Sequence, residues 1–71
     1  MNKPVRGLTR VFVVEDSELL RKRIVENVLA LGGFEVVGVA ESEAEAVQSI
    51  AELRPDIVIT DIRLKQGNGI A

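Results

Sequence analysis

Three acidic side chains follow two short apolar runs, close to the point where each run ends. Glu15 and Asp16 come directly after Val11–Val14, and Asp61 comes two residues after the run Ile57–Ile59. If both runs are strands of one parallel sheet, the three carboxylates converge at the edge where such sheets bind ligands. Like charges this close disfavour joint ionisation, and a hard cation relieves the repulsion. Ligands that are all oxygens predict Mg²⁺.

The composition excludes most other chemistry. The 71 residues contain no cysteine and no histidine, which excludes disulfides, zinc-thiolate sites, Ser-His triads and Cys-His nucleophiles. A net charge of -2 and an aromatic content of 3% argue against direct contact with nucleic acid. No stretch reaches the roughly 18 apolar residues of a membrane span, so we expect a cytoplasmic protein without membrane contact.

The first half of the chain predicts a strand, a helix and a second strand. Val11–Val14 is β-branched and apolar on both faces, as in a parallel sheet covered by helices. Ser17 is the expected N-cap of a helix that ends at Gly32–Gly33. Phe34–Ala40 predicts the second strand, with Gly38 as its weak point. The apolar stripe of the helix is expected at Leu20, Ile24, Val28 and Leu31.

The second half predicts another helix and a third strand. Ser42 and Glu45 fit a capping box, in which each side chain accepts from the other residue's amide, and Pro55 rules out helix beyond Arg54. Ile57–Ile59 is the third strand. The expected apolar face of this helix consists of Val47, Ile50 and Ala51.

Strands and helices in the order βαβαβ, with long connections, indicate an α/β protein with a parallel sheet. Residues 1–10 are expected to form a flexible basic arm and residues 11–71 most of one domain. Several charged residues have simpler explanations than chemistry. Glu15 is as often a turn or capping residue as a ligand. A solvated surface position is the favoured interpretation for Arg21, Lys22 and Arg23. For Glu52 and Asp56, a solvated surface position or a turn next to Pro55 is favoured over a functional role.

Two segments resemble the receiver domain of bacterial response regulators. Val11–Ser17 is similar to the opening of that domain, and Pro55–Leu64, followed by Gly69–Ile70, is similar to its phosphorylation segment. The resemblance implies a flavodoxin-like fold with strand order second, first, third, truncated after the third strand. It also implies two-component signalling rather than an enzyme in the ordinary sense.

The resemblance assigns a role to each residue of the predicted site. Asp61 would accept a phosphoryl group from a sensor histidine kinase or phosphotransfer protein. Asp16 would bind Mg²⁺ directly, Glu15 would act on it mostly through water, and Arg63 would bind through its backbone carbonyl. The chain departs from the family pattern at Lys65 and Gly67, which changes the loop and leaves the acids untouched.

The resemblance also predicts parts that this sequence does not contain. These are a Ser or Thr ending a fourth strand and a Lys ending a fifth, which normally contact the phosphoryl group. The alternative function is therefore a receiver fragment that cannot be switched and acts as a dimerisation or structural unit, through an exposed third strand. A nucleotide-binding flavodoxin-like domain ranks lower, because no Gly-rich phosphate loop follows the first strand.

Overall fold

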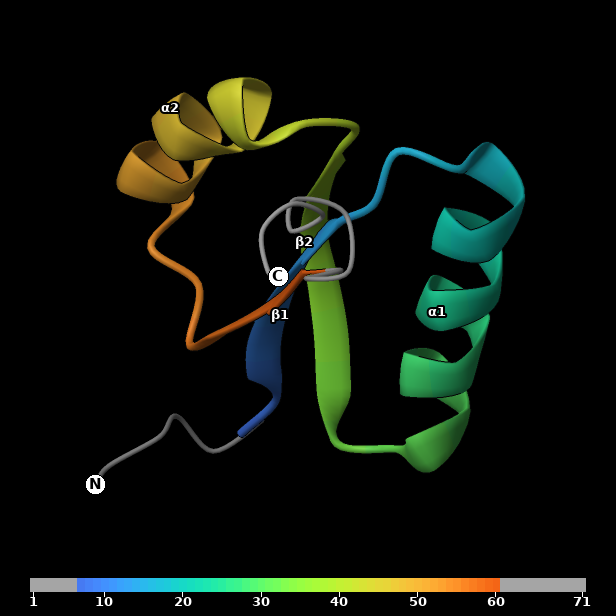
Figure 1. The fold of residues 1–71 in the computed structure, drawn as a ribbon. Coiled ribbons are helices and arrows are strands. Elements are labelled where there is room, and N and C mark those ends of the chain that lie inside the picture. The colour runs from blue at the N-terminus through green and yellow to red at the C-terminus, as the bar shows by residue number, and fades with distance from the viewer. Residues whose placement is uncertain (1–6, 61–71) are drawn as a thin grey trace, which may run out of the picture.

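The computed structural model describes residues 7–60, which form three strands and two helices in the predicted order (Figure 1). The sheet is parallel throughout, with strand order β2-β1-β3. The flavodoxin-like βαβαβ arrangement predicted from the sequence is confirmed. The elements are β1 (Thr9–Val14), α1 (Glu18–Leu31), β2 (Phe34–Ala40), α2 (Glu43–Leu53) and β3 (Ile57–Thr60).

The register brings the carboxyl ends of the three strands to one edge of the sheet. Val14, the last residue of β1, is paired with Ala40 of β2 on one side and with Thr60 of β3 on the other. Each of these three residues is the last of its strand. Whatever follows the strands in sequence therefore leaves the sheet at the same edge.

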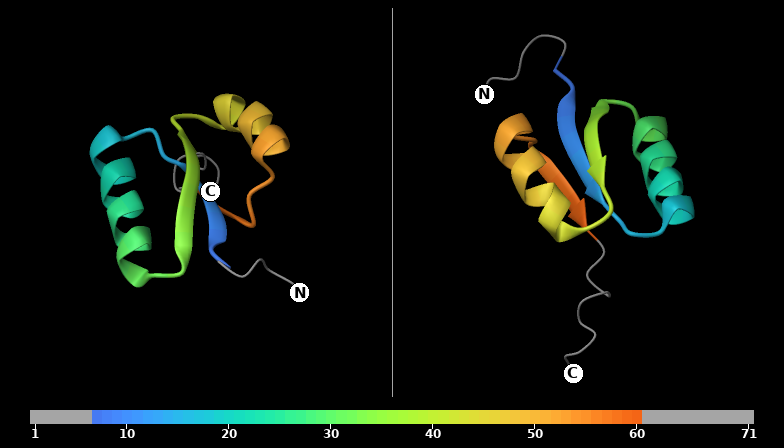
Figure 2. Two further views of the ribbon diagram at one scale, coloured as in Figure 1. Left: turned by 180° about the vertical axis from the view of Figure 1, so that it is seen from behind. Right: turned by 90° about the horizontal axis from the view of Figure 1, so that it is seen from above.

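The two helices cover opposite faces of the sheet, as the view from above shows (Figure 2). Alternate residues of β1 point to the two faces, so the central strand contributes to both cores. On the face of α1, Val11 and Val13 pack with Val28. On the face of α2, Phe12 and Val14 pack with Ala46. The two cores explain why β1 is apolar at every position from residue 11 onward.

Gly38 marks an irregularity between β1 and β2 that the sequence suggested. The register shifts there, because Val11 pairs with Val36 whereas Phe12 pairs with Gly38, which leaves Val37 without a paired residue. A Cβ atom at position 38 would lie 2.7 Å from Cε2 of Phe12. The glycine is therefore required by the close approach of the Phe12 ring rather than by an unusual backbone angle.

The strand β1 begins at Thr9, two residues before the run that the sequence predicted. The amide of Thr9 donates to the carbonyl of Gly33 at 2.9 Å. The amide of Arg10 donates to Oδ2 of Asp56 at 2.8 Å, and the carbonyl of Arg10 accepts from the amide of Asp56 at 2.8 Å. Thr9 and Arg10 thus belong to the sheet rather than to the expected arm, because partners distant in sequence supply their backbone hydrogen bonds. Residues 1–6 lie outside the described part of the chain.

The buried faces of both helices are narrower than the sequence predicted. On α1, Ile24 and Val28 lie in the core, but Leu20 is 39% exposed and Leu31 is 74% exposed. On α2, Ile50 packs against the core, but Val47 is 67% exposed and Ala51 is also exposed; buried Ala46 takes their place. The prediction of a buried position is wrong for these four residues, because a three-stranded sheet covers less of each helix than the apolar pattern spans. Neither helix within residues 7–60 is long and apolar enough to cross a membrane.

Candidate functional site

The acidic turn, residues Glu15 to Ser17, joins the carboxyl end of β1 to the start of α1. Because β1 is the central strand, this turn lies in the middle of the edge where all three strands end. Ser17 is the N-cap of α1, as predicted, since its Oγ accepts from the amide of Leu20 at 3.2 Å. The cap fixes where the helix begins, so only Glu15, Asp16 and Ser17 separate the strand from the helix.

Glu15 is buried, with only 2% of its surface exposed. Its Oε2 accepts from the amide of Ser17 at 3.0 Å, and its own amide donates to the carbonyl of Ala40 in β2 at 3.0 Å. A buried carboxylate is costly unless it is hydrogen-bonded or paired. The amide of Ser17 supplies one such hydrogen bond.

Asp16 is exposed, in contrast with its neighbour. The pair thus offers one carboxylate held inside the protein and one open to solvent, next to each other in the chain. A carboxylate oxygen can accept more than one bond, so the contact with Ser17 leaves lone pairs on Glu15 for a cation or its water. This all-oxygen set fits Mg²⁺, which keeps several waters and takes only one or two carboxylates.

The other two predicted site residues, Asp61 and Arg63, lie outside the described residues. Within residues 7–60, no group of three or more acidic side chains is placed so as to hold a metal ion. The described structure therefore brings together Glu15 and Asp16, and it establishes that β3 ends in register with β1 at the residue before Asp61.

Arg21 is the residue at this site that the sequence interpretation missed. It was expected on the solvated side of α1, but its side chain is only 16% exposed. Its Nη1 donates to the carbonyl of Glu15 at 2.9 Å, and its Nη2 lies 4.0 Å from Oε2 of Glu41. Arg21 lies four residues after the N-cap, and nothing in the sequence distinguishes it from its neighbours Lys22 and Arg23, which are both exposed.

The second strand-to-helix turn lies at the same edge and carries a different set of contacts. Ser42 caps α2 as predicted, accepting from the amide of Glu45 at 3.3 Å. The returning contact differs from the predicted capping box, because Oε1 of Glu45 accepts from the amide of Glu41 at 3.2 Å, one residue earlier than expected. These acids are all exposed, so this turn holds no buried carboxylate.

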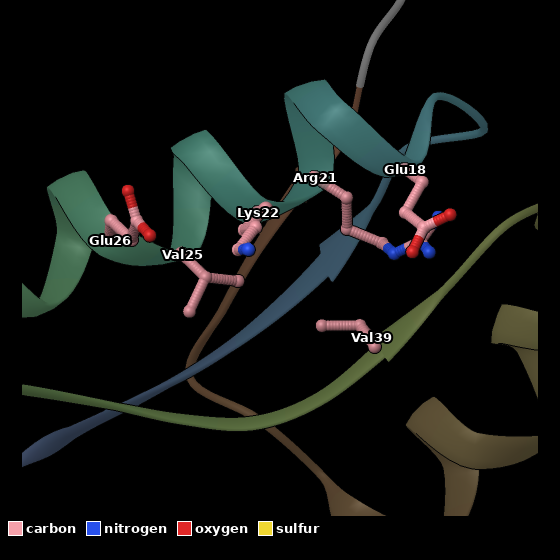
Figure 3. A pocket seen from close by; sticks show the side chains of 6 residues that line it. All are labelled: Glu18, Arg21, Lys22, Val25, Glu26 and Val39. Atoms are coloured by element: carbon pink, nitrogen blue, oxygen red, sulfur yellow. The ribbon is translucent and has the colours of Figure 1, made fainter.

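A hollow lies between α1 and β2, beside the acidic turn (Figure 3). Val25 and Val39 provide its apolar lining, and Arg21 extends from α1 toward the carboxyl end of β2. The remaining lining residues are charges of both signs: Glu18, Lys22 and Glu26. This mixture gives the hollow no preference for one sign of ligand charge.

Comparison with known proteins identifies the family. The model of the response regulator receiver domain matches residues 11–71. The chain belongs to the response regulator receiver family. It is 41% identical over 63 residues to the DNA-binding transcriptional activator DevR/DosR of Mycobacterium tuberculosis. It is 39% identical over 61 residues to the chemotaxis protein CheY of Thermotoga maritima. No solved structure matches.

The receiver chain spans half or less of the length of these relatives. The matches cover 89% of this chain but 29% of the activator, and 86% of this chain but 50% of the chemotaxis protein. A protein-glutamate methylesterase/protein-glutamine glutaminase of a Nocardioides species is 43% identical over 61 residues, which are 17% of its length. The shared part is thus the receiver portion of proteins whose names describe different activities. Receivers are modules of two-component signalling, and they interact with histidine kinases and generally bind Mg²⁺.

Proposed function

We propose that this receiver accepts a phosphoryl group on Asp61, with Mg²⁺ held by Glu15, Asp16, Asp61 and the backbone carbonyl of Arg63. The single observation that supports the proposal is the register of β1 and β3. Val14 and Thr60 are paired and end their strands, and each is followed directly by an acid, Glu15 and Asp61. In the sequence, an acid thus follows each of two paired residues, Val14 and Thr60.

The proposed step forms one bond and breaks another. A carboxylate oxygen of Asp61 attacks the phosphorus of a phosphohistidine on a sensor kinase, or of a phosphotransfer protein, and the P–N bond breaks as the O–P bond forms. The electron pair of the broken bond returns to the histidine nitrogen. Since phosphoryl transfer needs little covalent work from the protein, the task of the fold is alignment and neutralisation of charge.

The described residues supply the fixed part of this alignment. Glu15 is locked in place by its burial and by its bonds to Ser17 and Ala40, whereas Asp16 faces solvent, from which a hydrated cation arrives. Mg²⁺ would neutralise the charge that gathers on the phosphoryl oxygens. Asp16 is therefore the proposed direct ligand, and Glu15 acts mainly through a metal-bound water.

A mass measurement tests the proposal. The chain is incubated with Mg²⁺ and a small acyl phosphate, and we expect a mass gain of one phosphoryl group that is absent from Asp61→Asn and absent when the metal is chelated. Glu52→Gln is the matched control, because Glu52 is an exposed acid on α2 away from the acidic turn. Labelling of Asp61→Asn to the wild-type extent would contradict the assignment of the acceptor.

The same experiment distinguishes phosphoryl acceptance from the alternative function. A receiver portion that acts only as a dimerisation or structural unit would take no label, and sedimentation would show it as a dimer. A labelled monomer excludes this alternative. The cytoplasm, where sensor kinases present their phosphohistidine, is the proposed location.

A further inference from the structure

We propose that Arg21 is a positioning residue that holds the main chain of the acidic turn and thereby sets its affinity for a divalent cation. The inference rests on the proposed function for its metal, but its first test needs no metal. Arg21 donates from Nη1 to the carbonyl of Glu15 at 2.9 Å, so a side chain of α1 is bonded to the backbone between the two acids.

The contact ties the acidic turn to the neighbouring strand. Nη2 of the same guanidinium lies 4.0 Å from the carboxylate of Glu41, the first residue after β2. The planar fork of an arginine can engage two groups at fixed angles, which a lysine cannot do. Arg21 thus bridges the ends of β1 and β2 on the face that α1 covers, and Figure 3 shows its side chain extending in that direction.

With this contact, three bonds fix Glu15. Its amide is bonded to Ala40, its side chain to the amide of Ser17, and its carbonyl to Arg21. The carbonyl of Glu15 belongs to the peptide plane that links Glu15 to Asp16, so its orientation affects the direction in which the Asp16 side chain leaves the backbone. Loss of the Arg21 bond frees that plane and thereby loosens the neighbouring bond between the Glu15 side chain and the Ser17 amide.

The position of Arg21 in α1 distinguishes it from the other cations of the helix. Lys22 and Arg23 are exposed, whereas 16% of the Arg21 side chain is exposed. Arg21, whose side chain has a long aliphatic stem, lines the hollow together with Val25 and Val39. A purely structural role of that stem is the competing explanation, and Arg21→Met keeps an apolar stem while removing the guanidinium.

The test uses NMR spectra of the full chain, which has no tryptophan or tyrosine to report binding by fluorescence. Without metal, we expect Arg21→Met to speed amide exchange of Ser17 severalfold, because that amide is bonded to the side chain of Glu15. With Mg²⁺ added, we expect about tenfold weaker binding, the usual cost of losing a group that orients a metal ligand. Arg21→Lys should restore part of the affinity, since it keeps the charge without the fork.

Two variants serve as controls. Arg23→Met removes an exposed cation from the same helix and should leave both measurements unchanged. Ser42→Ala weakens the other strand-to-helix turn, so it reports what a general loss of stability does to the same measurements. If Ser42→Ala and Arg21→Met, compared at equal loss of thermal stability, change exchange and affinity equally, the role is structural and the proposal is overturned.

The exchange measurement also separates this inference from the proposed function. If the wild-type chain binds no Mg²⁺ but Arg21→Met still frees the Ser17 amide, the metal assignment fails and the positioning of the turn stands. If the amide is unaffected, the positioning role fails whatever the metal does.

Discussion

The strands β1 and β3 carry almost the same kind of sequence but lie in different surroundings. Val11–Val14 and Ile57–Ile59 are both uninterrupted apolar runs rich in β-branched residues. In the fold, Val13 is 0% exposed, whereas Val58 is 41% exposed. The central strand is covered by a helix on each face and by a strand on each side, and β3 has β1 beside it among the described residues.

The difference shows that an apolar run predicts a strand without predicting how deeply the strand is buried. Burial is decided by the order of strands, which is a property of the whole sheet. The proposed site takes residues from after both strands in the sequence, because Glu15 follows the most buried strand and Asp61 follows the more exposed one. The stability of β1 and the pairing of β3 therefore affect the site in different ways.

The largest effect is expected from Phe12→Ala in β1. Phe12 is 1% exposed and packs with Val14 and Ala46, and truncation of a buried aromatic typically costs about 3 to 5 kcal/mol. A core of this size rarely supplies more than that amount, so we expect the variant to be unfolded at room temperature by far-UV circular dichroism.

Ile57→Ala in β3 is the matched comparison for this truncation. Ile57 is exposed, and we expect a loss of about 1 kcal/mol with the fold retained. Equal destabilisation by Phe12→Ala and Ile57→Ala would show that β3 is buried as deeply as β1 and would break the contrast between the strands.

A smaller effect is expected where β1 meets β2. Gly38→Ala places a Cβ 2.7 Å from Cε2 of Phe12 and 3.1 Å from Cδ1 of Leu53, so the ring must shift. Overpacking of this kind typically costs about 1 to 3 kcal/mol in the free energy of unfolding. Urea denaturation measures it.

A double-mutant cycle identifies the cause. Phe12→Leu removes the ring atoms that Cβ would meet, so Gly38→Ala should cost less in that background than in the wild type. An unchanged cost would mean that the alanine acts through the backbone and not through Phe12.

Much of this fold could be predicted from the sequence, because the relevant signals are local. Ser17 and Ser42 cap the helices as expected, Pro55 follows the end of α2, and Gly38 marks the irregular pairing of β2. The helix caps and the end of α2 depend on a residue and its near neighbours, whereas the irregular pairing at Gly38 also involves Phe12 of β1. The order of the strands followed from the resemblance to receivers rather than from any of these signals.

The features that the sequence did not predict depend on contacts between distant segments. Thr9 and Arg10 are in β1 because Gly33 and Asp56 bond to them. Leu31 and Val47 are exposed because the sheet does not extend beneath them.

Arg21 has a carbonyl partner six residues earlier, across the acidic turn, and no pattern of charges along α1 reveals it. The pair Glu15 and Asp16 was predicted from spacing, but their opposite exposure was not.

Asp56→Ala tests how the start of β3 is held beside β1. Oδ2 of Asp56 accepts from the amide of Arg10, and the variant removes that acceptor while it keeps the backbone bond from the Asp56 amide. Since the bond is exposed and water can replace the carboxylate, we expect a loss of about 1 kcal/mol in the free energy of unfolding. Glu52→Ala, at an exposed position of α2, is the control and should be close to neutral. A loss no greater than that of the control would mean that the backbone pairing alone joins β3 to β1.

The smallest effect is expected from Val58→Thr, which replaces a methyl group by a hydroxyl without changing the shape of the side chain. At 41% exposure the hydroxyl reaches water, so the free energy of unfolding should change by no more than about 0.5 kcal/mol. The same change at Val13 buries the hydroxyl among Val11, Val28 and their neighbours, where a polar group without a partner costs about 1 to 3 kcal/mol. Urea denaturation of the two variants compares identical chemistry in the two strands. A near-neutral Val13→Thr would mean that the centre of the sheet admits water, and the burial of β1 could then no longer explain how Glu15 is held in place.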